Sequence, residues 1–253
     1  MFERFNHYWR LFGTGLSFFL FGAVGVVFWG MLFPLMAPFL GQSLQKQLRS
    51  RWLMQQIFRI YMNFMQTIGI LSYQVHGKER LACPGRLVIA NHPCLLDIVF
   101  LLSQIPNATC IVKPALAGNP FMRIPIRAMG YIYAESAQDL MARCVAELQA
   151  GSALIIFPEG TRTTPGQALK FQRGAANIAL QAQVPILPIR LSCNPTTLTK
   201  QEKWYQIPAR RFKLSIETGE EITLDSRPKD AERSLLARRL TRQLEDYFKQ
   251  KAG

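Results

Sequence analysis

Acidic residues are scarce in this chain: 16 Asp and Glu stand against 30 Lys and Arg, a formal net charge of +14 over 253 residues. Such an excess favours a polyanionic partner, either nucleic acid or the anionic surface of a bilayer. Charged residues make up only 18% of the chain and hydrophobic residues 49%, which favours the bilayer. We therefore predict membrane lipids as a partner and no nucleic acid.

Paired cysteine motifs are also missing. The five cysteines are scattered without a CxxC or Cys…His-x-x-His spacing, so neither a disulfide framework nor a zinc site is indicated. A reducing compartment is the simplest interpretation, and we predict no metal and no cofactor. No G-x-S-x-G segment is present, which argues against a serine hydrolase.

Charge is absent altogether from Leu11 to Gly41. This stretch exceeds the about 20 apolar residues that cross a hydrocarbon core, so it predicts a membrane anchor. A signal peptide would have a shorter apolar region and a small-x-small cleavage site. Pro34 and Pro38 should kink or end the helix, which leaves a single span and a re-entrant hairpin both open. Basic residues flank both sides and are more numerous afterwards, which predicts a cytoplasmic or inner membrane with the remaining chain facing the cytoplasm.

The segment after the anchor has the periodicity of an amphipathic helix. Its apolar residues recur at spacings of three and four; they are Leu53, Ile57, Ile60, Phe64 and Ile68. This pattern fits a helix in the membrane interface and equally a helix packed on a domain core. We expect an N-terminal membrane element over residues 1–72 and an α/β domain over residues 73–253.

The rest of the chain alternates Val- and Ile-rich runs with helical patterns, which indicates an α/β fold with a mixed sheet flanked by helices. A strand and turn are expected in YQVHGKERL, and a helix that Ser136 caps and that stops at Gly151. A basic amphipathic helix should begin near Pro228 and end the chain. Further strands are expected near residues 86–91, 108–113, 130–135, 153–157, 186–191 and 212–217.

The segment VIANHPCLLDIVF, residues 88–100, places a histidine and an aspartate five positions apart after a strand. Asn91, His92 and Pro93 form the expected turn, and Asp97 should lie in the first turns of the following helix. A carboxylate there can fix the tautomer of the imidazole and stabilise its protonated form, so that His92 can take a proton from an alcohol. On its own this motif is weak, because many histidines are structural.

A second polar turn, in IIFPEGTR, follows another apolar strand about sixty residues later. A glycine turn exposes backbone N–H groups, and Arg162 offers a planar fork to a phosphate. The two turns together predict a general base beside an anion-binding loop.

These motifs, in this order and spacing, resemble those of the 1-acyl-sn-glycerol-3-phosphate (lysophosphatidic acid) acyltransferase family of glycerophospholipid acyltransferases. NHPCLLD is similar to the NHxxxxD box of that family and FPEGTR to its second hallmark. VKPALAGNPFMRIPIRAMGYIYAES and VPILPIRL resemble two further blocks. The resemblance covers roughly residues 75 to 220 and implies an α/β domain beside an N-terminal membrane-binding helical element.

The resemblance implies an O-acyltransferase of phospholipid biosynthesis. His92, held by Asp97, would deprotonate the hydroxyl of a lysophospholipid, which then attacks an acyl thioester without an acyl-enzyme intermediate. The default reaction converts 1-acylglycerol-3-phosphate to phosphatidic acid, with acyl-CoA or acyl carrier protein as donor. Asn91 would support the dyad or an oxyanion donor. The residues that would bind the acceptor phosphate are Lys113, Glu159, Gly160, Thr161 and Arg162.

One position departs from the family pattern. Members commonly close the intermediate block with an acidic residue followed by arginine, whereas this chain has Glu135 followed by Ser136. Either another arginine substitutes for the missing one, or the acceptor is a different lysolipid, including one that contains an amino acid. The arginines that could substitute are Arg123, Arg127 and Arg173.

Two other functions are weighed against acyl transfer. Cys94 lies two residues from His92, so a hydrolase of lipid esters or thioesters with a thiol nucleophile is an alternative, although buried cysteines are usually inert. The basic charge alone would also suit a non-catalytic module that binds anionic lipid or nucleic acid. Such a module would leave both motifs unexplained.

Overall fold

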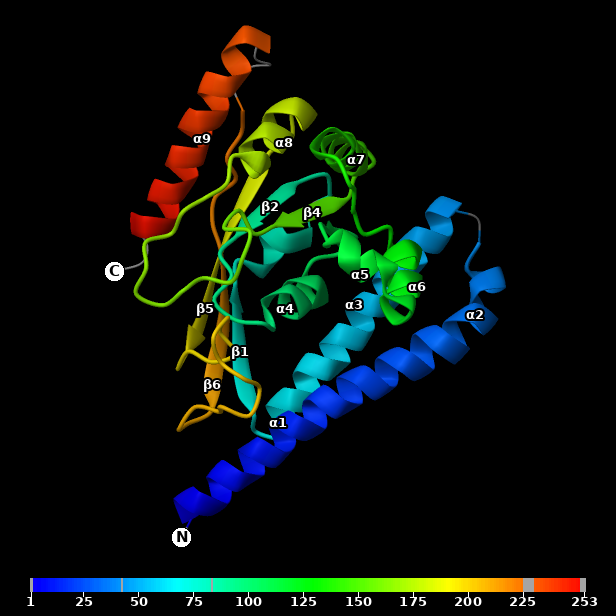
Figure 1. Ribbon diagram of the computed structural model, residues 1–253, viewed down its shortest axis with the longest axis vertical. Helices are drawn as coiled ribbons and strands as arrows, with labels where there is room; N and C mark the ends of the chain where they lie inside the picture. The colour runs from blue at the N-terminus through cyan, green and yellow to red at the C-terminus, as the bar shows by residue number, and fades with distance from the viewer. Residues whose placement is uncertain (1, 42, 83, 225–229, 251–253) are drawn as a thin grey trace.

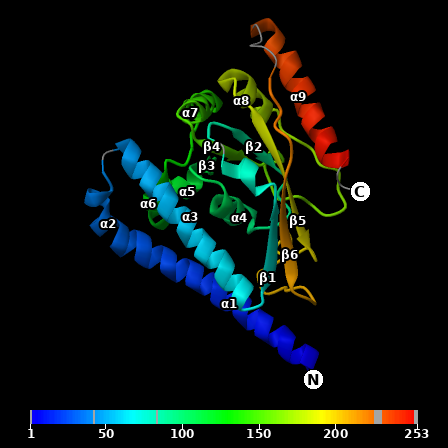
Figure 2. The ribbon, with the colours of Figure 1, turned by 180° about the vertical axis from the view of Figure 1, so that it is seen from behind.

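The computed structural model describes residues 2–41, 43–82, 84–224 and 230–250. A twisted sheet runs through the molecule, with helices on both of its faces (Figures 1 and 2). The strand order is β1-β6-β5-β2-β4-β3. Neighbouring strands are parallel except β5 and β6, which are antiparallel. The expected mixed α/β fold is therefore confirmed. The strands are β1 (Leu71–His76), β2 (Leu87–Ala90), β3 (Ala108–Cys110), β4 (Ala153–Ile156), β5 (Ile186–Asn194) and β6 (Phe212–Thr218).

Strands β2 and β4 are apolar along their whole length because both faces of the sheet are covered there. In β2, Leu87 and Ile89 point to one face and Val88 and Ala90 to the other, as the alternation of side chains along a strand requires. The first face packs on α7 (Ala137–Gln149), α8 (Gly174–Ala182) and α9 (Asp230–Gln250). The second packs on α3 (Ser43–Thr67) and α4 (Asp97–Gln104).

One expected strand does not form. The segment expected as a strand at 130–135 makes a single bridge, between Ile132 and Ile111. It is too short for a strand because α6 (Pro120–Met129) ends immediately before it, Gly130 turns the chain with φ +61°, and Ser136 already caps α7. The capped helix at Ser136 is confirmed. The strand expected in YQVHGKERL is confirmed as β1, which a 3₁₀ turn follows at Lys78–Ala82.

The N-terminal segment is one long, exposed, apolar helical element. Residues Phe5–Leu40 have the length to cross a membrane, and their most apolar 18-residue window has a mean hydropathy of 2.2 and is only 17% buried. Large side chains such as Phe12, Phe19 and Phe39 are exposed by 61%, 68% and 83%, which indicates membrane association. The element comprises α1 (Phe2–Val27), a π-helical turn (Phe28–Leu32), α2 (Phe33–Met36) and a 3₁₀ turn (Ala37–Leu40).

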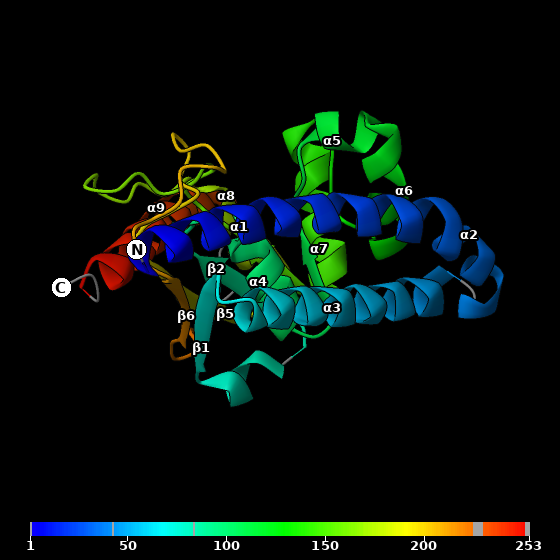
Figure 3. The ribbon, with the colours of Figure 1, turned by 90° about the horizontal axis from the view of Figure 1, so that it is seen from below.

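The helix changes type around the two prolines and ends after the second. Pro34 lies in the first turn of α2 and Pro38 in the first turn of the 3₁₀ segment, after which Gly41 has φ +90°. The chain then reverses, so that α3 runs back alongside α1 (Figure 3). Phe21 of α1 contacts Tyr61 of α3 with ring centroids 5.2 Å apart. The anchor and α3 therefore form a helical hairpin.

The α3 helix packs on the core of the α/β domain, one of the two arrangements that its sequence allowed. Its buried stripe consists of Met54, Phe58, Met62 and Met65, whereas Ile60 of the expected stripe is 67% exposed. The other four expected residues, Leu53, Ile57, Phe64 and Ile68, are partly buried and pack against the same core. The boundary expected between residues 72 and 73 falls inside β1, which begins at Leu71.

A buried arginine ties α3 to the opposite side of the sheet. The Arg51 guanidinium donates to the carbonyl oxygen of Met129 (2.7 Å), to Oδ1 of Asn107 (2.8 Å), to Oγ of Ser152 (2.7 Å) and to Oε2 of Glu147 (2.9 Å). The Arg51 side chain is 3% exposed. Burial raises the pKa of Glu147, but the charge of Arg51 and the hydrogen bonds from Ser152 and Arg51 outweigh it and hold that pKa below its ordinary value.

We expect the substitution Arg51→Met to destabilise the protein by roughly 3–5 kcal/mol, because it leaves a half-buried carboxylate without its partner. Arg49→Met on the same helix is the control, since Arg49 is exposed and makes one bond to the carbonyl oxygen of Phe39. A depressed carboxyl pKa contributes stability above the ordinary value of about 4.3, and that stability is lost as the pH falls through the folded-state pKa. Thermal unfolding should therefore show a large gap between wild type and Arg51→Met at neutral pH that narrows below pH ~4. Equal unfolding temperatures for Arg51→Met and Arg49→Met would contradict this assignment.

Candidate active site

Two loops meet at the carboxyl edge of the sheet. Strands β2 and β4 are parallel neighbours in which Ile89 is paired with Ile156. The loops that follow them therefore leave the sheet side by side, as loops at the carboxyl ends of parallel strands do. The first loop carries the turn of the histidine motif, and the second carries FPEGTR.

The histidine and the aspartate of the first loop are in contact. His92 Nδ1 lies 2.9 Å from Oδ2 of Asp97, which begins α4. The same oxygen accepts the N–H of Cys94 at 2.6 Å. The side chain of Asp97 is 1% exposed and that of His92 is 16% exposed. The carboxylate is thus sealed in the interior, while the imidazole reaches the surface.

Two opposing effects act on the pKa of Asp97. Burial raises the pKa of Asp97, and the hydrogen bonds from the His92 ring and the Cys94 N–H lower it by a smaller amount. The position of Asp97 at the first residue of α4 also favours a negative charge, because the positive end of the helix dipole lies there. The second carboxylate oxygen, Oδ1, has no hydrogen-bond partner among the described residues.

The second loop holds the main chain of the first. Glu159 Oε1 accepts the backbone N–H of His92 at 3.1 Å and the hydroxyl of Thr163 at 2.7 Å. The backbone N–H of Thr163 donates to the carbonyl oxygen of His92 at 2.7 Å. Burial raises the pKa of Glu159, and these hydrogen bonds offset part of the rise. Glu159 therefore faces the histidine loop rather than an open anion-binding turn.

Two residues of this site were not singled out from the sequence. The ring of Phe157 stacks on the imidazole of His92, with centroids 4.1 Å apart and planes at 17°. Thr163 joins both loops through its hydroxyl and its backbone N–H. Neither belongs to a pattern of charged or titratable residues, and their contact with His92 follows from the register of β2 and β4.

Asn91 is bound to the neighbouring strand β5. Its side-chain amide donates to the carbonyl oxygen of Leu191 and accepts the N–H of Leu191, both at 2.8 Å. This pairing fixes the start of the histidine loop to the sheet. It favours a supporting function for the Asn91 side chain over donation to an oxyanion.

Arg162 is anchored to a third loop. Its Nη1 donates to the carbonyl oxygens of Leu198 and Thr199, at 2.9 and 2.8 Å. Nε and Nη2 make no hydrogen bond to the residues that the structure describes. Before it, Gly160 turns with φ +68°, and both Gly160 and Thr161 are exposed.

Lys113 lies at the same edge of the sheet, one strand further out. It follows β3, which pairs with β4 through Cys110 and Ile155, and its side chain is exposed.

Ser136, at the position that departs from the family pattern, caps a helix: its Oγ accepts the N–H of Asp139 at 3.1 Å. The hydroxyl of Ser136 thus has a structural partner.

The cysteine beside the histidine is enclosed. Cys94 is fully buried, and its hydrogen bond with the Cys193 side chain, its burial and the charge of Asp97 raise the pKa of the thiol well above its ordinary value. A thiol in such a setting is a poor nucleophile.

Cys83 lies outside the described residues, as does Pro228. Within the described ranges, no cluster of three or more His, Cys, Asp or Glu is placed to hold a metal ion.

The fold belongs to a known class. A crystal structure of the 1-acyl-sn-glycerophosphate (LPA) acyltransferase PlsC from Thermotoga maritima superimposes with a TM-score of 0.72, covering 96% of this chain and 95% of that one at 22% identity. The two share a fold in which a mixed six-stranded sheet with flanking helices follows a long apolar N-terminal helix. Residues 72–192 match the family model described as Acyltransferase, so this part of the chain is similar to that family.

Two curated relatives extend the comparison. A 1-acyl-sn-glycerol-3-phosphate acyltransferase of Saccharomyces cerevisiae is 30% identical over 69% of this chain and 58% of its own length. Another, from Pseudomonas aeruginosa, is 27% identical over 68% of each chain. This chain thus spans less than two thirds of the yeast relative.

Proposed function

We propose that this protein transfers a fatty acyl group from an acyl thioester to the free hydroxyl of a lysophospholipid, with 1-acylglycerol-3-phosphate as the acceptor and phosphatidic acid as the product. The observation that carries the proposal is the contact of 2.9 Å between His92 Nδ1 and a buried Asp97 carboxylate, with the imidazole partly exposed at the carboxyl edge of the sheet. The relatedness to 1-acyl-sn-glycerol-3-phosphate acyltransferases supports it.

The proposed mechanism is general-base catalysis without a covalent intermediate. Asp97 holds the proton of the imidazole on Nδ1, so that Nε2 is the atom that accepts a proton. Nε2 takes the proton of the acceptor hydroxyl as its oxygen attacks the thioester carbonyl, and an ester bond forms. When the carbon–sulfur bond breaks, the imidazolium returns the proton to the leaving thiolate. Phe157 covers one face of the ring and Glu159 holds the main chain of His92, so that the base keeps its orientation.

The acceptor phosphate is assigned to cations near this edge. Arg162 presents Nε and Nη2, while Nη1 stays bound to the Leu198–Thr199 loop. Two parallel N–H donors of a guanidinium match two oxygens of a phosphate. Lys113 contributes a second positive charge from the end of β3. Gly160 and Thr161 shape the turn, and Glu159 and Asn91 act as positioning residues.

We further propose that residues 1–72 hold the α/β domain, residues 73–253, at the cytoplasmic face of an inner or cytoplasmic membrane. The exposed apolar surface of α1 supports membrane association, and the basic residues after the anchor support the orientation. The acceptor and product are lipids, so an enzyme at the bilayer surface meets both without their transfer through water.

The test of the acceptor compares Arg162→Ala with wild type on lysophosphatidic acid, a monoacylglycerol and a lysolipid that contains an amino acid. For lysophosphatidic acid, kcat/KM should fall by about 10–100-fold, because one or two charge-assisted hydrogen bonds to the phosphate are lost. The monoacylglycerol lacks a phosphate, so its kcat/KM should fall much less. Arg162→Lys keeps the charge but not the fork, and should give an intermediate loss.

Three outcomes are informative. Equal losses for lysophosphatidic acid and the monoacylglycerol would show that Arg162 only holds the Leu198–Thr199 loop. A wild-type preference for the amino-acid lysolipid would move the acceptor to that class, which the helix-capping Ser136 at the departing position allows. No transfer to any acceptor would overturn the proposed function.

A further inference from the structure

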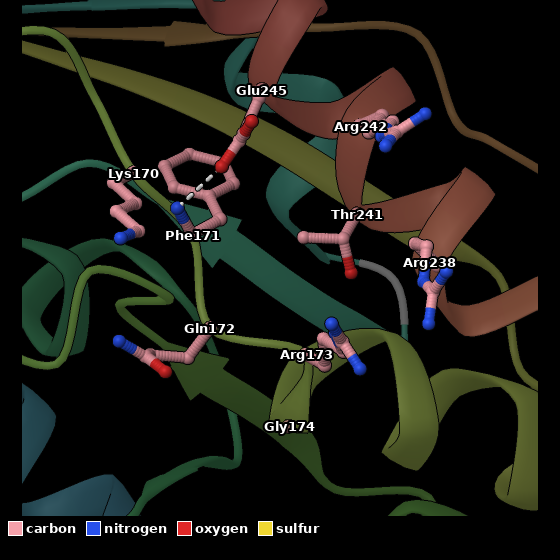
Figure 4. A pocket seen from close by; sticks show the side chains of 9 residues that line it. All are labelled: Lys170, Phe171, Gln172, Arg173, Gly174, Arg238, Thr241, Arg242 and Glu245. Carbon is pink, nitrogen blue, oxygen red and sulfur yellow. Dashed lines mark hydrogen bonds between the residues drawn. The ribbon is translucent and has the colours of Figure 1, made fainter. Parts of the chain in front are cut away.

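An open hollow lies between α8 and α9, with a volume of about 840 Å³. Figure 4 shows it from close by, with Arg173 at the start of α8 facing Arg238 of α9 and with Lys170 towards its other end. We call it the α8–α9 hollow. Its lining residues are Lys170, Phe171, Gln172, Arg173, Gly174, Arg238, Thr241, Arg242 and Glu245.

The positive charge of this hollow is not balanced by the protein. The one acidic residue of the lining, Glu245, accepts the backbone N–H of Phe171 at 2.7 Å and lies 3.9 Å from Nζ of Lys249. The four cationic side chains of the lining form no hydrogen bond or ion pair with any residue in the described ranges. Like charges gathered in a concave surface repel one another and attract an anion. The first turn of α8 adds the positive end of its dipole.

The hollow is physically joined to the dyad. The backbone N–H of Gln172 donates to the carbonyl oxygen of Pro158 at 2.7 Å. On one side of Pro158 is Phe157, which stacks on His92, and on the other is Glu159, which accepts the His92 N–H. One loop, residues 157–173, therefore contacts His92 of the dyad near its start and lines the hollow at its end.

We propose that the α8–α9 hollow binds the phosphate-bearing nucleotide end of coenzyme A and thereby makes acyl-CoA the donor. This inference rests on the proposed acyl transfer. In an acyl-CoA the phosphates are separated from the thioester by the pantetheine arm, so they must bind away from the reacting carbonyl. The acceptor phosphate, in contrast, is attached to the same small glycerol unit as the reacting hydroxyl. The two substrates thus need two anion sites at different distances from His92.

The shape and lining favour a small nucleotide over other anions. The volume lies within the range of about 300–1,000 Å³ that is usual for small-ligand pockets. An acidic carrier protein would instead dock on a surface patch of about 800 Å². A lipid surface would need exposed apolar side chains around the cations, whereas the aromatic residue of the lining, Phe171, is buried.

The test compares Arg238→Gln with Arg239→Gln, in the full-length chain purified in detergent. The two arginines are neighbours on α9, both are exposed, and only the first lines the hollow. The dissociation constant for coenzyme A should rise about tenfold in Arg238→Gln, the loss expected for one charge-assisted hydrogen bond. The ratio of kcat/KM for acyl-CoA to kcat/KM for the acyl-pantetheine thioester, which lacks phosphates, should fall by a similar factor. Arg239→Gln should keep the wild-type dissociation constant and ratio.

The inference is overturned if both variants bind coenzyme A like the wild type. It is also overturned if Arg238→Gln impairs only the use of acyl carrier protein, or only binding to vesicles that contain phosphatidylglycerol. If coenzyme A binding weakens in Arg238→Gln but the wild type transfers no acyl group, the hollow binds coenzyme A and the proposed function is wrong. If all three proteins transfer the acyl group with the same ratio of kcat/KM for acyl-CoA to kcat/KM for the acyl-pantetheine thioester, the proposed function stands and the hollow is not the coenzyme A site.

Discussion

Replacing His92 by alanine should lower kcat for acyl transfer by about 10²–10⁴-fold, the contribution typical of a general base. The protein should remain folded, because the bonds of this residue to Glu159 and Thr163 involve its main chain. The loss of the stacked contact with Phe157 should cost about 1 kcal/mol of stability, and the loss of the hydrogen bond to the buried Asp97 a further roughly 1–3 kcal/mol. Initial rates with an acyl thioester and a lysophospholipid, together with a thermal unfolding curve, measure both effects.

Cys94→Ala is the matched comparison for that experiment. The Cys94 side chain is buried, and the hydrogen bond from Cys94 to Asp97 comes from its main-chain N–H. We therefore expect this variant to retain the wild-type kcat within a small factor, since no step of the proposed mechanism uses the thiol. The opposite pattern, with an active His92→Ala and an inactive but folded Cys94→Ala, would replace the dyad mechanism by thiol catalysis.

Asp97→Asn should lower kcat by about 10²–10⁴-fold with little change in KM, because the imidazolium formed during the reaction loses its counter-charge. Asp97 Oδ2 accepts both hydrogen bonds and Oδ1 has no described partner. The amide oxygen of the asparagine can therefore take the place of Oδ2, so that the imidazole keeps its tautomer and only the charge is removed. Asp139→Asn, on the exposed side of α7, should leave kcat at the wild-type value.

The same variant tests the raised pKa of Asp97. A carboxyl whose folded-state pKa is raised costs stability when it is ionised. That cost is absent below the ordinary pKa of about 3.9 and complete above the raised value. The unfolding temperature of Asp97→Asn relative to the wild type should therefore increase as the pH rises from about 4 to 8. A difference that is constant over this range would show that burial does not raise this pKa.

Much of the candidate site could be inferred from the sequence because its residues lie at fixed distances along one chain. Five positions from His92 to Asp97 allow a turn and the start of a helix, and those two elements bring an imidazole and a carboxylate together. The Ser136 cap and the apolar run after residue 10 are similarly local. Such features depend on backbone geometry and on hydrophobicity, which the residues of a short segment contain.

The functions of the FPEGTR residues could not be inferred in this way. The sequence predicted an anion-binding turn, which stays a prediction, but it did not show that Glu159 holds the main chain of His92 or that Arg162 is anchored to the Leu198–Thr199 loop. Both contacts join segments that are distant in sequence. They depend on which strands are neighbours in the sheet and on their register, and the residues of one segment determine neither.

The sequence by itself determined that this chain is an α/β protein with an apolar N-terminal helix and a histidine paired with an aspartate, because periodicity, spacing and charge are properties of the chain. Only the tertiary structure decided that α3 packs on the domain core and that β1 joins the sheet beside β6. It alone gathered the cations of residues 170–173 and of α9 around one hollow. The physical reason is that packing and strand order are chosen by the burial of all apolar surfaces together, which no local pattern specifies.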